Sequence, residues 1–394
     1  MKEKFLTKLK KLNLKKKIFY WSPFLVRIAT PRAVINSAYS LIKFSEDYDC
    51  SIINFFGEFD KYQNDIKKKK IKLINHSKFR ISKILPSEGK IQSRFSFLVM
   101  FCLGFFPLKK LISDRKRDYI VIHLITSLPL ILLMFFNFET KFILRISGLP
   151  KLTFFRKFIW KKALKKIHCV TCPTLKTQEY ILNQNLVSKD KIKLLYDPVI
   201  NVGEIQKKIN EKFSVPVQDD YYCAIGRLTK QKNFMFLCKA FKKVINKYPK
   251  IRLLIIGEGE QKKILTHYIK KNDLEKNIFL IGFLDNIFYI LSRSKGFILS
   301  SLWEDPGFVI VEAAFCRVPI ISSDCDNGPK ELIKDNINGI LFKSNNIENF
   351  LIKFDEFIKL EKNSNKLLLN NLKMSKKFTL FNHHLNFKKT LIDV

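Results

Sequence analysis

A short segment in the second half of the chain has residue types suited to binding a phosphate group. Residues 222–233 begin with an apolar run that ends at Gly226, and Arg227 follows directly. Lys232 lies five positions further along, at the predicted start of a helix. Arginine and lysine side chains bind phosphate oxygens, and the unpaired N–H groups at a helix start favour negative charge. We therefore predict an anion site here that suits a diphosphate.

Two carboxylates further along the chain could bind hydroxyl groups. Glu304 and Glu312 are eight positions apart, the first in a predicted loop and the second inside the next predicted helix. Gly307 stands near the start of that helix, where backbone N–H groups have no partner within the helix. A carboxylate accepts hydrogen bonds from neighbouring hydroxyls, so two spaced acids suit a sugar and a ribose. The alternative is a surface acid and a helix acid without a ligand, but an unpaired acid in an apolar helix is costly.

Taken together and in order, these motifs resemble the retaining glycosyltransferases of family four, which have the GT-B fold. The ordered set is specific, whereas each piece alone is not. It consists of Gly226-Arg227-x4-Lys232, Gly257-x-Gly259 and Glu304-x2-Gly307-x4-Glu312, followed by the stretch 322–331 and by Asn338-Gly339. The resemblance covers residues 220–345 and is looser over the first half.

The resemblance implies transfer of a sugar from a nucleotide donor, with retention of configuration and without a bound metal. It implies no cofactor, since the nucleotide sugar is a substrate, and we expect a UDP-linked donor before a GDP-linked one. Glu304 would contact hydroxyls of the transferred sugar, and Glu312 would hold the ribose hydroxyls. The donor diphosphate would be held by side chains and backbone amides of Arg227, Lys232, Gly307, Phe308 and Val309.

In the first half, the resemblance implies a role for a histidine. Asp118-x4-His123 is similar to the family segment that ends in a histidine, which would hydrogen-bond the donor sugar near the reaction centre. His123 and Glu304 are therefore the predicted catalytic residues. The alternative for His123 is a satisfied histidine in an apolar strand. The chain departs from the family in its first loop, because residues 22–31 contain no glycine.

Two further motifs could bind a metal ion. Asp324-Cys-Asp326 matches the Asp-x-Asp pattern of metal-dependent glycosyltransferases, but such tripeptides are common by chance. Cys169-Val-Thr-Cys172 is a single CxxC without a second pair at zinc spacing, which favours two thiols in a strand. We predict no metal site. The eight cysteines are scattered through apolar runs, a pattern typical of reduced, buried thiols in a cytosolic protein.

The elements that must position these residues follow from the hydrophobic pattern. Short apolar runs alternate with helical stretches, which predicts parallel sheets covered by helices. Predicted strands in the first half are 17–21, 50–54, 119–123, 141–145, 168–171 and 191–195. In the second half they are 221–225, 252–256, 278–281, 296–299, 318–321 and 339–342.

Because this pattern occurs twice, we predict an α/β chain of the GT-B type, with two doubly wound Rossmann-like domains facing a cleft. The break falls within residues 198–218, which contain two prolines and a glycine. Residues 1–200 would form the acceptor-side domain and 201–374 the nucleotide-sugar domain. A C-terminal helix over 375–394 would pack back on the first domain.

Two apolar runs are candidates for membrane spans. Residues 119–138 have the length of a bilayer span, about 20 residues, but Pro129 and its polar neighbours divide the run. A buried strand, turn and helix is therefore favoured over a spanning helix. Phe95–Pro107 is too short to span and is predicted to be a buried or interfacial helix.

The net charge of +37 is unevenly distributed. Residues 1–200 hold 40 basic and 14 acidic residues, whereas 201–394 hold 32 and 21. One explanation is a phosphate-rich partner, and the other is codon bias in an AT-rich genome, which does not explain the asymmetry. Met1–Lys17 has apolar residues at helical spacing between lysines, as in an interfacial helix or a surface helix docked on its own domain. With the Lys67–Lys70 run, it predicts peripheral attachment to an anionic membrane surface, on the cytoplasmic face.

The sequence thus predicts a glycosyltransferase that acts on a glycan or lipid-linked acceptor. We expect a place in bacterial surface polysaccharide synthesis, such as lipopolysaccharide, O-antigen or capsule. One alternative is another GT-B enzyme, such as a nucleotide-sugar epimerase or a phosphorylase. Another is a basic nucleic-acid-binding protein, but the sequence shows no zinc finger, RNP signature or homeodomain-like helix, so we predict no nucleic-acid partner.

Overall fold

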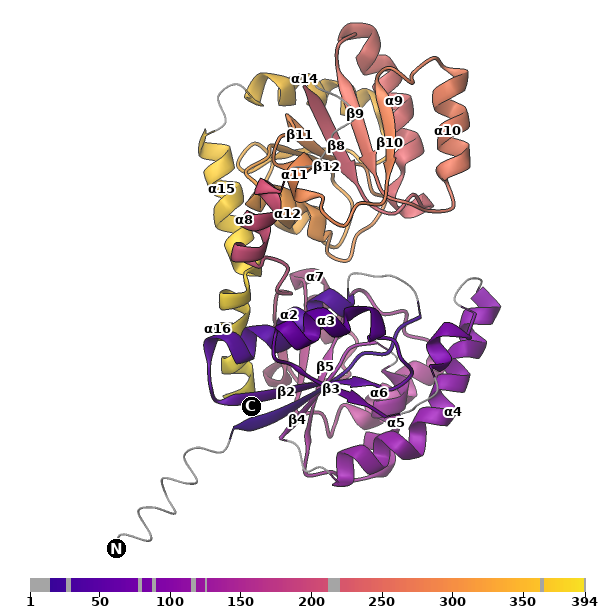
Figure 1. Ribbon diagram of the computed structural model, residues 1–394, viewed down its shortest axis with the longest axis vertical. Helices are drawn as coiled ribbons and strands as arrows, with labels where there is room; N and C mark the ends of the chain where they lie inside the picture. Colours follow the sequence, from indigo (N-terminus) through magenta and orange to yellow (C-terminus); the bar gives the residue numbers. More distant parts are fainter. Residues whose placement is uncertain are drawn as a thin grey trace, which may run out of the picture. The chain divides into compact units, whose positions relative to one another are not determined.

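The computed structural model describes residues 15–25, 30–76, 80–86, 90–114, 118–124, 126–211, 220–361 and 365–392. The chain forms two compact units, one of Met1–Pro198 with Leu380–Val394 and the other of Val199–Thr379 (Figure 1). The sequence placed these divisions after residues 200 and 374. The predicted interfacial helix at Met1–Lys17 falls almost wholly outside the described residues, and its last two lysines begin the first strand.

Within its described residues, the first unit has a seven-stranded parallel sheet in the order β3-β2-β1-β4-β5-β6-β7. The order reverses between β1 and β4, so the switch point of this doubly wound sheet lies between those two strands. The strands are β1 Lys16–Trp21, β2 Tyr48–Asn54, β3 Lys72–Asn75, β4 Tyr119–Ile122, β5 Lys141–Arg145, β6 Cys169–Cys172 and β7 Ile192–Leu194.

Helices cover both faces of this sheet. One face packs against α4 Lys90–Asp114, α5 Ser127–Phe135 and α6 Phe154–Ala163. The other packs against α2 Thr30–Phe44, α3 Gln63–Lys68 and α16 Leu380–Ile392. Helix α7 Leu175–Asn183 also belongs to the described part of this unit.

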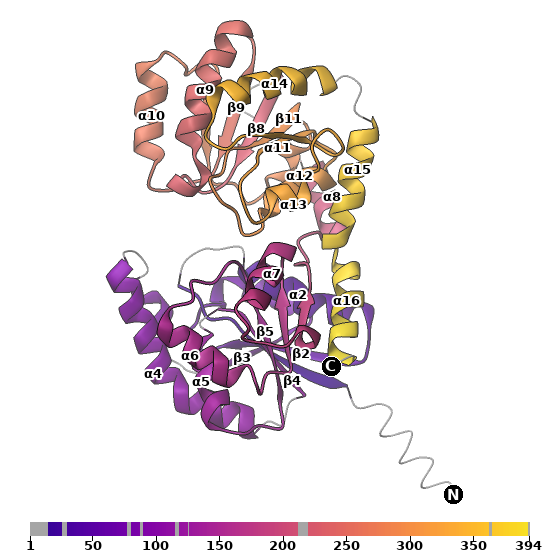
Figure 2. The same cartoon turned by 180° about the vertical axis from the view of Figure 1, so that it is seen from behind.

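The C-terminal helix α16 belongs to the first unit although it is distant from it in sequence. It packs along α2, and the two views show these helices side by side (Figures 1 and 2). The Tyr119 hydroxyl donates a hydrogen bond to the Leu391 carbonyl at 2.7 Å. Phe387 and Leu391 are both buried against the sheet. The end of the chain therefore completes the core of the first unit.

The apolar run over residues 119–138 is a strand, a turn and a helix, as predicted. All four residues of β4 are buried, and so are all four leucines of α5. By length and composition alone, one described helix could cross a membrane: residues 94–114 of α4, with 33% of its most apolar stretch buried.

The apolar run Phe95–Pro107 was predicted to be too short to span a membrane, and this length is wrong, because the run is part of the longer helix α4. Pro107 lies inside α4, where it removes one backbone hydrogen bond. Leu108, Leu111 and Ile112 follow it and are buried in the core. Their burial offsets the lost hydrogen bond, so the helix continues to Asp114.

In the part of the second unit that the structure describes, the sheet is six-stranded and parallel, in the order β10-β9-β8-β11-β12-β13. Its switch point lies between β8 and β11. The strands lie at or beside their predicted positions: β8 Tyr221–Ile225, β9 Arg252–Ile256, β10 Ile278–Gly282, β11 Gly296–Leu299, β12 Ile320–Ser323 and β13 Ile340–Phe342.

Phenylalanines from α9, α14 and β13 form the centre of one core layer in this unit. The rings of Phe342 and Phe350 are 5.0 Å apart, and those of Phe350 and Phe354 are 5.5 Å apart. The α-helices among the described residues of this unit are α8 Val202–Asn210, α9 Phe234–Lys247, α10 Lys262–Lys271, α11 Phe288–Leu291, α12 Phe308–Phe315, α13 Pro329–Leu332, α14 Ile347–Glu361 and α15 Asn365–Ser375.

Glycines let the loops after β8 and β9 lie directly against each other. A Cβ atom at Gly257 would lie 1.8 Å from the Gly226 carbonyl oxygen, and its φ is +148°. A Cβ atom at Gly259 would lie 2.5 Å from the Leu228 carbonyl oxygen. The Leu228 amide donates to the Glu258 carbonyl at 2.9 Å. Both glycines of the Gly-x-Gly motif are therefore needed for this close backbone contact.

We predict that Gly257→Ala lowers the free energy of unfolding by more than about 2 kcal/mol, because its Cβ atom would overlap backbone. Urea unfolding monitored by circular dichroism measures the change. Gly203→Ala is the matched control, since nothing lies within 4 Å of its Cβ position in α8. It should be neutral or slightly stabilising, and equal destabilisation of both variants would contradict the prediction.

Candidate active site

A buried ion pair joins the two loops at the switch point of the second unit. The Lys232 ammonium, in the short helical turn Lys230–Lys232, lies 2.5 Å from Glu304 Oε1. The Ser301 hydroxyl donates to the same oxygen at 2.5 Å. Glu304 follows β11 and Lys232 follows β8, and these strands are neighbours in the sheet. The structure thus brings two predicted site residues into direct contact.

Gln231 strengthens this connection. Its side-chain amide donates to the Trp303 backbone carbonyl at 2.9 Å, and the Gln231 backbone carbonyl accepts from the Leu302 amide at 2.8 Å. The Arg227 guanidinium lies 3.5 Å from Gln231 Oε1 and is exposed. Sequence reasoning missed Gln231 and Ser301, because neither carries charge. The partner of Gln231 is also distant in sequence, whereas Ser301 lies only three positions before Glu304.

Gly226 makes room for the lysine. A Cβ atom at this position would lie 3.1 Å from both Lys232 Cδ and Lys232 Cε. The lysine methylene groups therefore pass over the glycine and direct the ammonium to Glu304. This contact gives a physical reason for a glycine before the arginine in the Gly-Arg-x4-Lys motif.

Gly307 begins α12 with a backbone that favours glycine. Its φ is +86°, in the left-handed region, and it occupies the position just before Phe308. A Cβ atom there would lie 3.3 Å from Glu304 Cγ. Phe308 and Val309, both partly buried, form the first turn, whose N–H groups have no partner within the helix. These amides follow Glu304 of the ion pair by four and five positions. Their N–H groups, at the positive end of the helix dipole, favour binding of an anion.

Glu312 lies one turn further along α12, between buried apolar residues. Val311 and Ala313 beside it are fully buried, and Glu312 itself is half-buried. Glu304 and Glu312 are thus carried by one continuous segment, the loop after β11 and the helix that follows. With Arg227 and Lys232 across the switch point, the arrangement can bind a polyanion beside groups that accept hydroxyl hydrogen bonds.

His123 lies at the corresponding switch point of the first unit, directly after β4. It is 5% exposed, and its Nε2 atom has no hydrogen-bond partner among the described residues. Its ring stacks on Tyr20 at 6.3 Å. Burial, with the nearby charges of Arg145 and His383, lowers the pKa of His123 well below its usual value. The imidazole is therefore neutral, and it lines a cavity of about 390 Å³.

A buried polar network that the sequence did not predict surrounds this histidine. Arg145, at the end of β5, forms a buried ion pair with Asp197. His383 of α16 lies 2.9 Å from the Ser37 hydroxyl, which in turn lies 3.1 Å from the Tyr20 hydroxyl. These residues come from distant segments, so only the strand order and the return of α16 bring them together.

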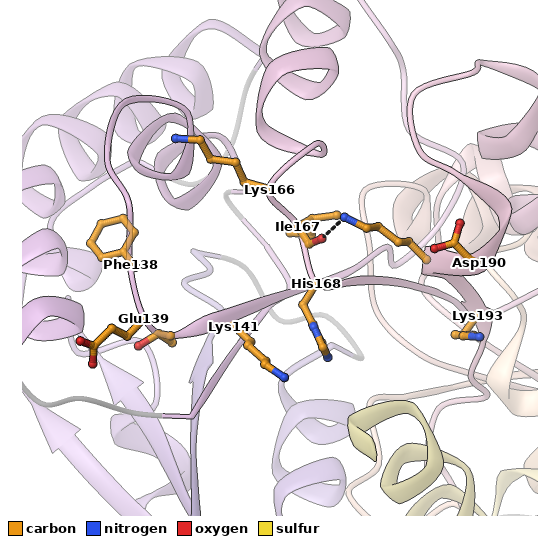
Figure 3. A pocket seen from close by; sticks show the side chains of 10 residues that line it. Phe138, Glu139, Lys141, Lys166, Ile167, His168, Asp190 and Lys193 are labelled. Atoms are coloured by element: carbon orange, nitrogen blue, oxygen red, sulfur yellow. Dashed lines mark hydrogen bonds between the residues drawn. The ribbon is translucent and has the colours of Figure 1, made fainter. Parts of the chain in front are cut away.

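A second cavity, of about 600 Å³, lies at the opposite, amino-terminal edge of the same sheet (Figure 3). Lys141, Lys166 and Lys193 line it, and none of the predicted site residues does. Lys191 donates to the Ile167 carbonyl at 2.9 Å, the interaction drawn as a dashed line. Burial and the nearby lysines lower the pKa of His168 to about 4. This basic cavity is separate from the switch point.

The two candidate metal motifs have other contacts. Asp324 accepts a hydrogen bond from the Ser344 amide at 2.8 Å, and the Lys330 ammonium lies 3.8 Å from Asp324 and 3.9 Å from Asp326. Burial raises the pKa of the Cys169 and Cys172 thiols to about 12, so both are protonated in β6. Across the described ranges, no group of three or more His, Cys, Asp or Glu side chains is placed to hold a metal ion.

Comparison with known proteins identifies the family. The family described as "Glycosyl transferases group 1" matches residues 205–374. An uncharacterized glycosyltransferase of Methanocaldococcus jannaschii is 30% identical over 324 residues, which span 76% of this chain and 75% of the relative. The chain belongs to the group 1 glycosyltransferases. It is therefore a glycosyltransferase, as the motifs predicted.

Two further similarities add detail to this membership. An α-1,4-N-acetyl-D-galactosaminyltransferase of Campylobacter jejuni, named for an acceptor linked to PP-undecaprenol, is 26% identical over 347 residues, 87% of this chain and 88% of that one. The crystal structure of Anabaena HepE in complex with UDP superposes with a TM-score of 0.68 at 14% identity, covering 97% of this chain and all of HepE. The group 1 glycosyltransferase described here thus has the predicted GT-B fold.

The buried histidines make the stability of this glycosyltransferase depend on pH. Burial is also the main reason that the pKa of His383 falls to about 4. The unfolded chain takes up protons near pH 6.5 while the folded chain does not, so stability is full above that pH and falls below it. We expect the loss due to His383 alone to reach about 3 kcal/mol by pH 4.

Urea unfolding at pH 7, 6, 5 and 4 measures this loss. His383→Gln should reduce the slope between pH 6.5 and 4, because it removes one proton-binding difference. His267→Gln is the control, since His267 is exposed on α10, and it should leave the slope unchanged. A slope that is the same in all three proteins would contradict the assignment.

Proposed function

We propose that the enzyme transfers a sugar from a UDP-sugar to a lipid-diphosphate-linked glycan, with retention of configuration and without a bound metal. The observation that carries this proposal is the Lys232–Glu304 pair beside the start of α12. It places a cation, a carboxylate and unpaired helix amides at the switch point of one parallel sheet. Ligands of such sheets bind at this position.

The donor diphosphate is assigned to Arg227, Lys232 and the first amides of α12. These groups present positive charge to an anion whose own charge grows as the bond to the sugar breaks. The UDP in HepE supports a uridine nucleotide for a chain of the same fold, and a GDP-sugar is the second choice. Glu312 is assigned to the ribose hydroxyls, because it is a half-buried carboxylate in the same helix.

The ion pair gives Lys232 and Glu304 linked roles. The carboxylate holds the ammonium in place and neutralises it. An arriving diphosphate would attract the ammonium, which would free Glu304 to accept hydrogen bonds from hydroxyls of the transferred sugar. In the first unit, His123 has a neutral ring and a free Nε2 facing no described partner, which suits a hydrogen bond to a sugar hydroxyl.

The acceptor and the location are proposed from relatives and from charge. The Campylobacter relative is named for a glycan on PP-undecaprenol, and a lipid-linked acceptor of that kind lies at a membrane. We place the enzyme on the cytoplasmic face of the membrane, held peripherally by anionic lipid and acting in surface polysaccharide synthesis. The +26 of residues 1–200 supports this placement. In the Lys67–Lys70 run, Lys69 pairs with Asp65, so this lysine contributes less than predicted.

Substitutions at the donor site should separate binding from catalysis. We expect Glu312→Gln to raise the donor KM about ten- to a hundredfold, because an amide accepts less strongly than a carboxylate from the ribose hydroxyls. Lys232→Ala should lower kcat more than it raises KM, since charge on the leaving group grows in the transition state. Transfer or hydrolysis of UDP-sugars, followed by release of UDP, measures both.

Glu348→Gln is the matched control for the carboxylate, because Glu348 is largely exposed on α14. It should leave kcat and KM as in the wild type. An unchanged KM in Glu312→Gln would refute the ribose assignment. Failure of a full panel of nucleotide sugars to react would refute the proposed reaction.

We expect activity to persist in EDTA, because two side-chain cations and helix amides neutralise the departing diphosphate without a metal. The same release assay, with and without added Mn²⁺ after chelation, measures this. Lys330 lies near both Asp324 and Asp326, so it would have to move for a metal to bind there. Loss of activity in EDTA with rescue by Mn²⁺ would overturn the metal-free mechanism.

A further inference from the structure

The outward face of α4 is apolar, unlike that of an ordinary surface helix. Its inward face is a helical stripe of buried residues that includes Ser96, Met100, Gly104 and Leu108. A Cβ atom at Gly104 would lie 2.9 Å from Leu128 Cδ1, so the helix lies closely on the core. The face turned to solvent would normally be polar. It carries instead Phe95, Phe97, Leu98, Leu103 and Phe106.

The neighbouring surface helix α6 has the same character. Phe154 is 83% exposed, Phe155 is 77% exposed and Phe158 is 49% exposed. Trp160 and Ala163 form the buried side of the helix. Large aromatic side chains exposed together in this way require a partner surface.

These two helices border one cavity. Phe97 of α4 and Arg156 and Trp160 of α6 line the same 390 Å³ cavity as His123. Both helices, with α5 between them in sequence, pack on the same face of the first sheet, and both views show them on one side of this unit (Figures 1 and 2). The exposed phenylalanines of α4 and α6 are named here the α4–α6 surface.

Basic residues share the two helices with the phenylalanines of the α4–α6 surface, and the Lys162 ammonium lies 4.7 Å from the centre of the Phe158 ring. Described basic residues of the two helices and of the turn after α6 are Arg94, Lys109, Lys110, Arg156, Lys157, Lys161, Lys162, Lys165 and Lys166. No acidic residue falls between positions 90 and 113 or between 151 and 166. Exposed aromatic rings beside lysines and arginines are typical of helices that lie in the interface of an anionic bilayer.

We propose that the α4–α6 surface inserts its phenylalanines into the acyl region of an anionic bilayer, with its basic border at the phosphate headgroups. A second copy of the chain fits this surface less well, because two basic borders would repel each other, whereas anionic headgroups neutralise them. Spanning is not required, since the inward face of α4 remains packed on Leu128 and the core.

The inference deepens the membrane attachment proposed above and rests on it. Attachment by charge alone would release the enzyme in high salt, because ionic contacts are screened. An inserted apolar surface retains part of its binding in salt, because burial of phenylalanine does not depend on ionic strength. Insertion of the α4–α6 surface also determines which side of the first unit faces the lipid. Because residues of both helices line the His123 cavity, this orientation brings the cavity to the headgroup region.

Depth-dependent quenching tests the contact directly. The emission added by Phe155→Trp, taken as the variant minus the wild type, should be quenched at least twofold by vesicles of phosphatidylglycerol and brominated phosphatidylcholine, relative to the same vesicles without bromine. The matched control is Ile264→Trp on α10 of the second unit, an exposed apolar position at 59%. It should show no more quenching than the wild type, whose exposed tryptophan is Trp303. Equal quenching of the two variants would overturn the proposed surface.

Flotation of the full chain with the same vesicles gives an independent measure. In 0.5 M salt, the triple variant Phe154→Ser, Phe155→Ser, Phe158→Ser should bind the vesicles at least tenfold less than the wild type does. Ile264→Ser should float as the wild type does. Release of UDP from UDP-sugars should be similar in all three proteins, so a folding defect or a failed reaction is distinguished from lost attachment. A triple variant that floats like the wild type in high salt would refute the inference.

Wild-type protein that never floats, in low or high salt, would refute both this inference and the proposed attachment. Wild-type protein that floats in low salt and is released completely in 0.5 M salt would refute the inserted surface and leave attachment by charge.

Discussion

The site in the second unit depends on one buried ion pair, between Lys232 and Glu304. Burial of two charges is favourable only where their geometry and remaining hydrogen bonds are satisfied. Here Ser301 donates to the same carboxylate oxygen that the ammonium contacts. Gly226 leaves room for the lysine, and the left-handed Gly307 turns the chain into α12 beside the carboxylate. The switch point is the place where β8 and β11 lie side by side in the sheet. Lys232 follows β8 and Glu304 follows β11, so the topology of the sheet brings the two side chains together.

The switch point of the first unit differs, because a buried neutral imidazole lies there near a buried ion pair. His123 is kept uncharged by burial and by the Arg145 charge, and Arg145 is itself paired with Asp197. His383 arrives from the end of the chain and joins this layer. The C-terminal helix is therefore part of the environment of the catalytic candidate. A neutral imidazole can donate and accept hydrogen bonds, which is the chemistry needed to orient a hydroxyl.

The sequence predicted what depends on local pattern and missed what depends on distant contacts. The six described strands of the second unit are short apolar runs. Arg227, Lys232, Glu304 and Gly307 lie in the loops after two of these strands, so their spacing in the sequence was enough to predict the site. Strand β3 was missed because it lies at the sheet edge and none of its residues is fully buried. Arg145 paired with Asp197 could not be predicted, since their proximity depends on strand order.

Composition alone explains neither the lysines nor the phenylalanines of this chain. An AT-rich genome would raise both, and the chain has 37 phenylalanines. Codon bias, however, does not choose between core and surface. In the described part of the second unit, exposed large apolar residues such as Ile264 and Ile352 are on separate helices, as in ordinary soluble proteins. On α4 and α6 they gather within one basic border. The number of phenylalanines and lysines can reflect codon bias. Their grouping on α4 and α6 is therefore the observation that distinguishes a lipid-binding surface from a biased composition.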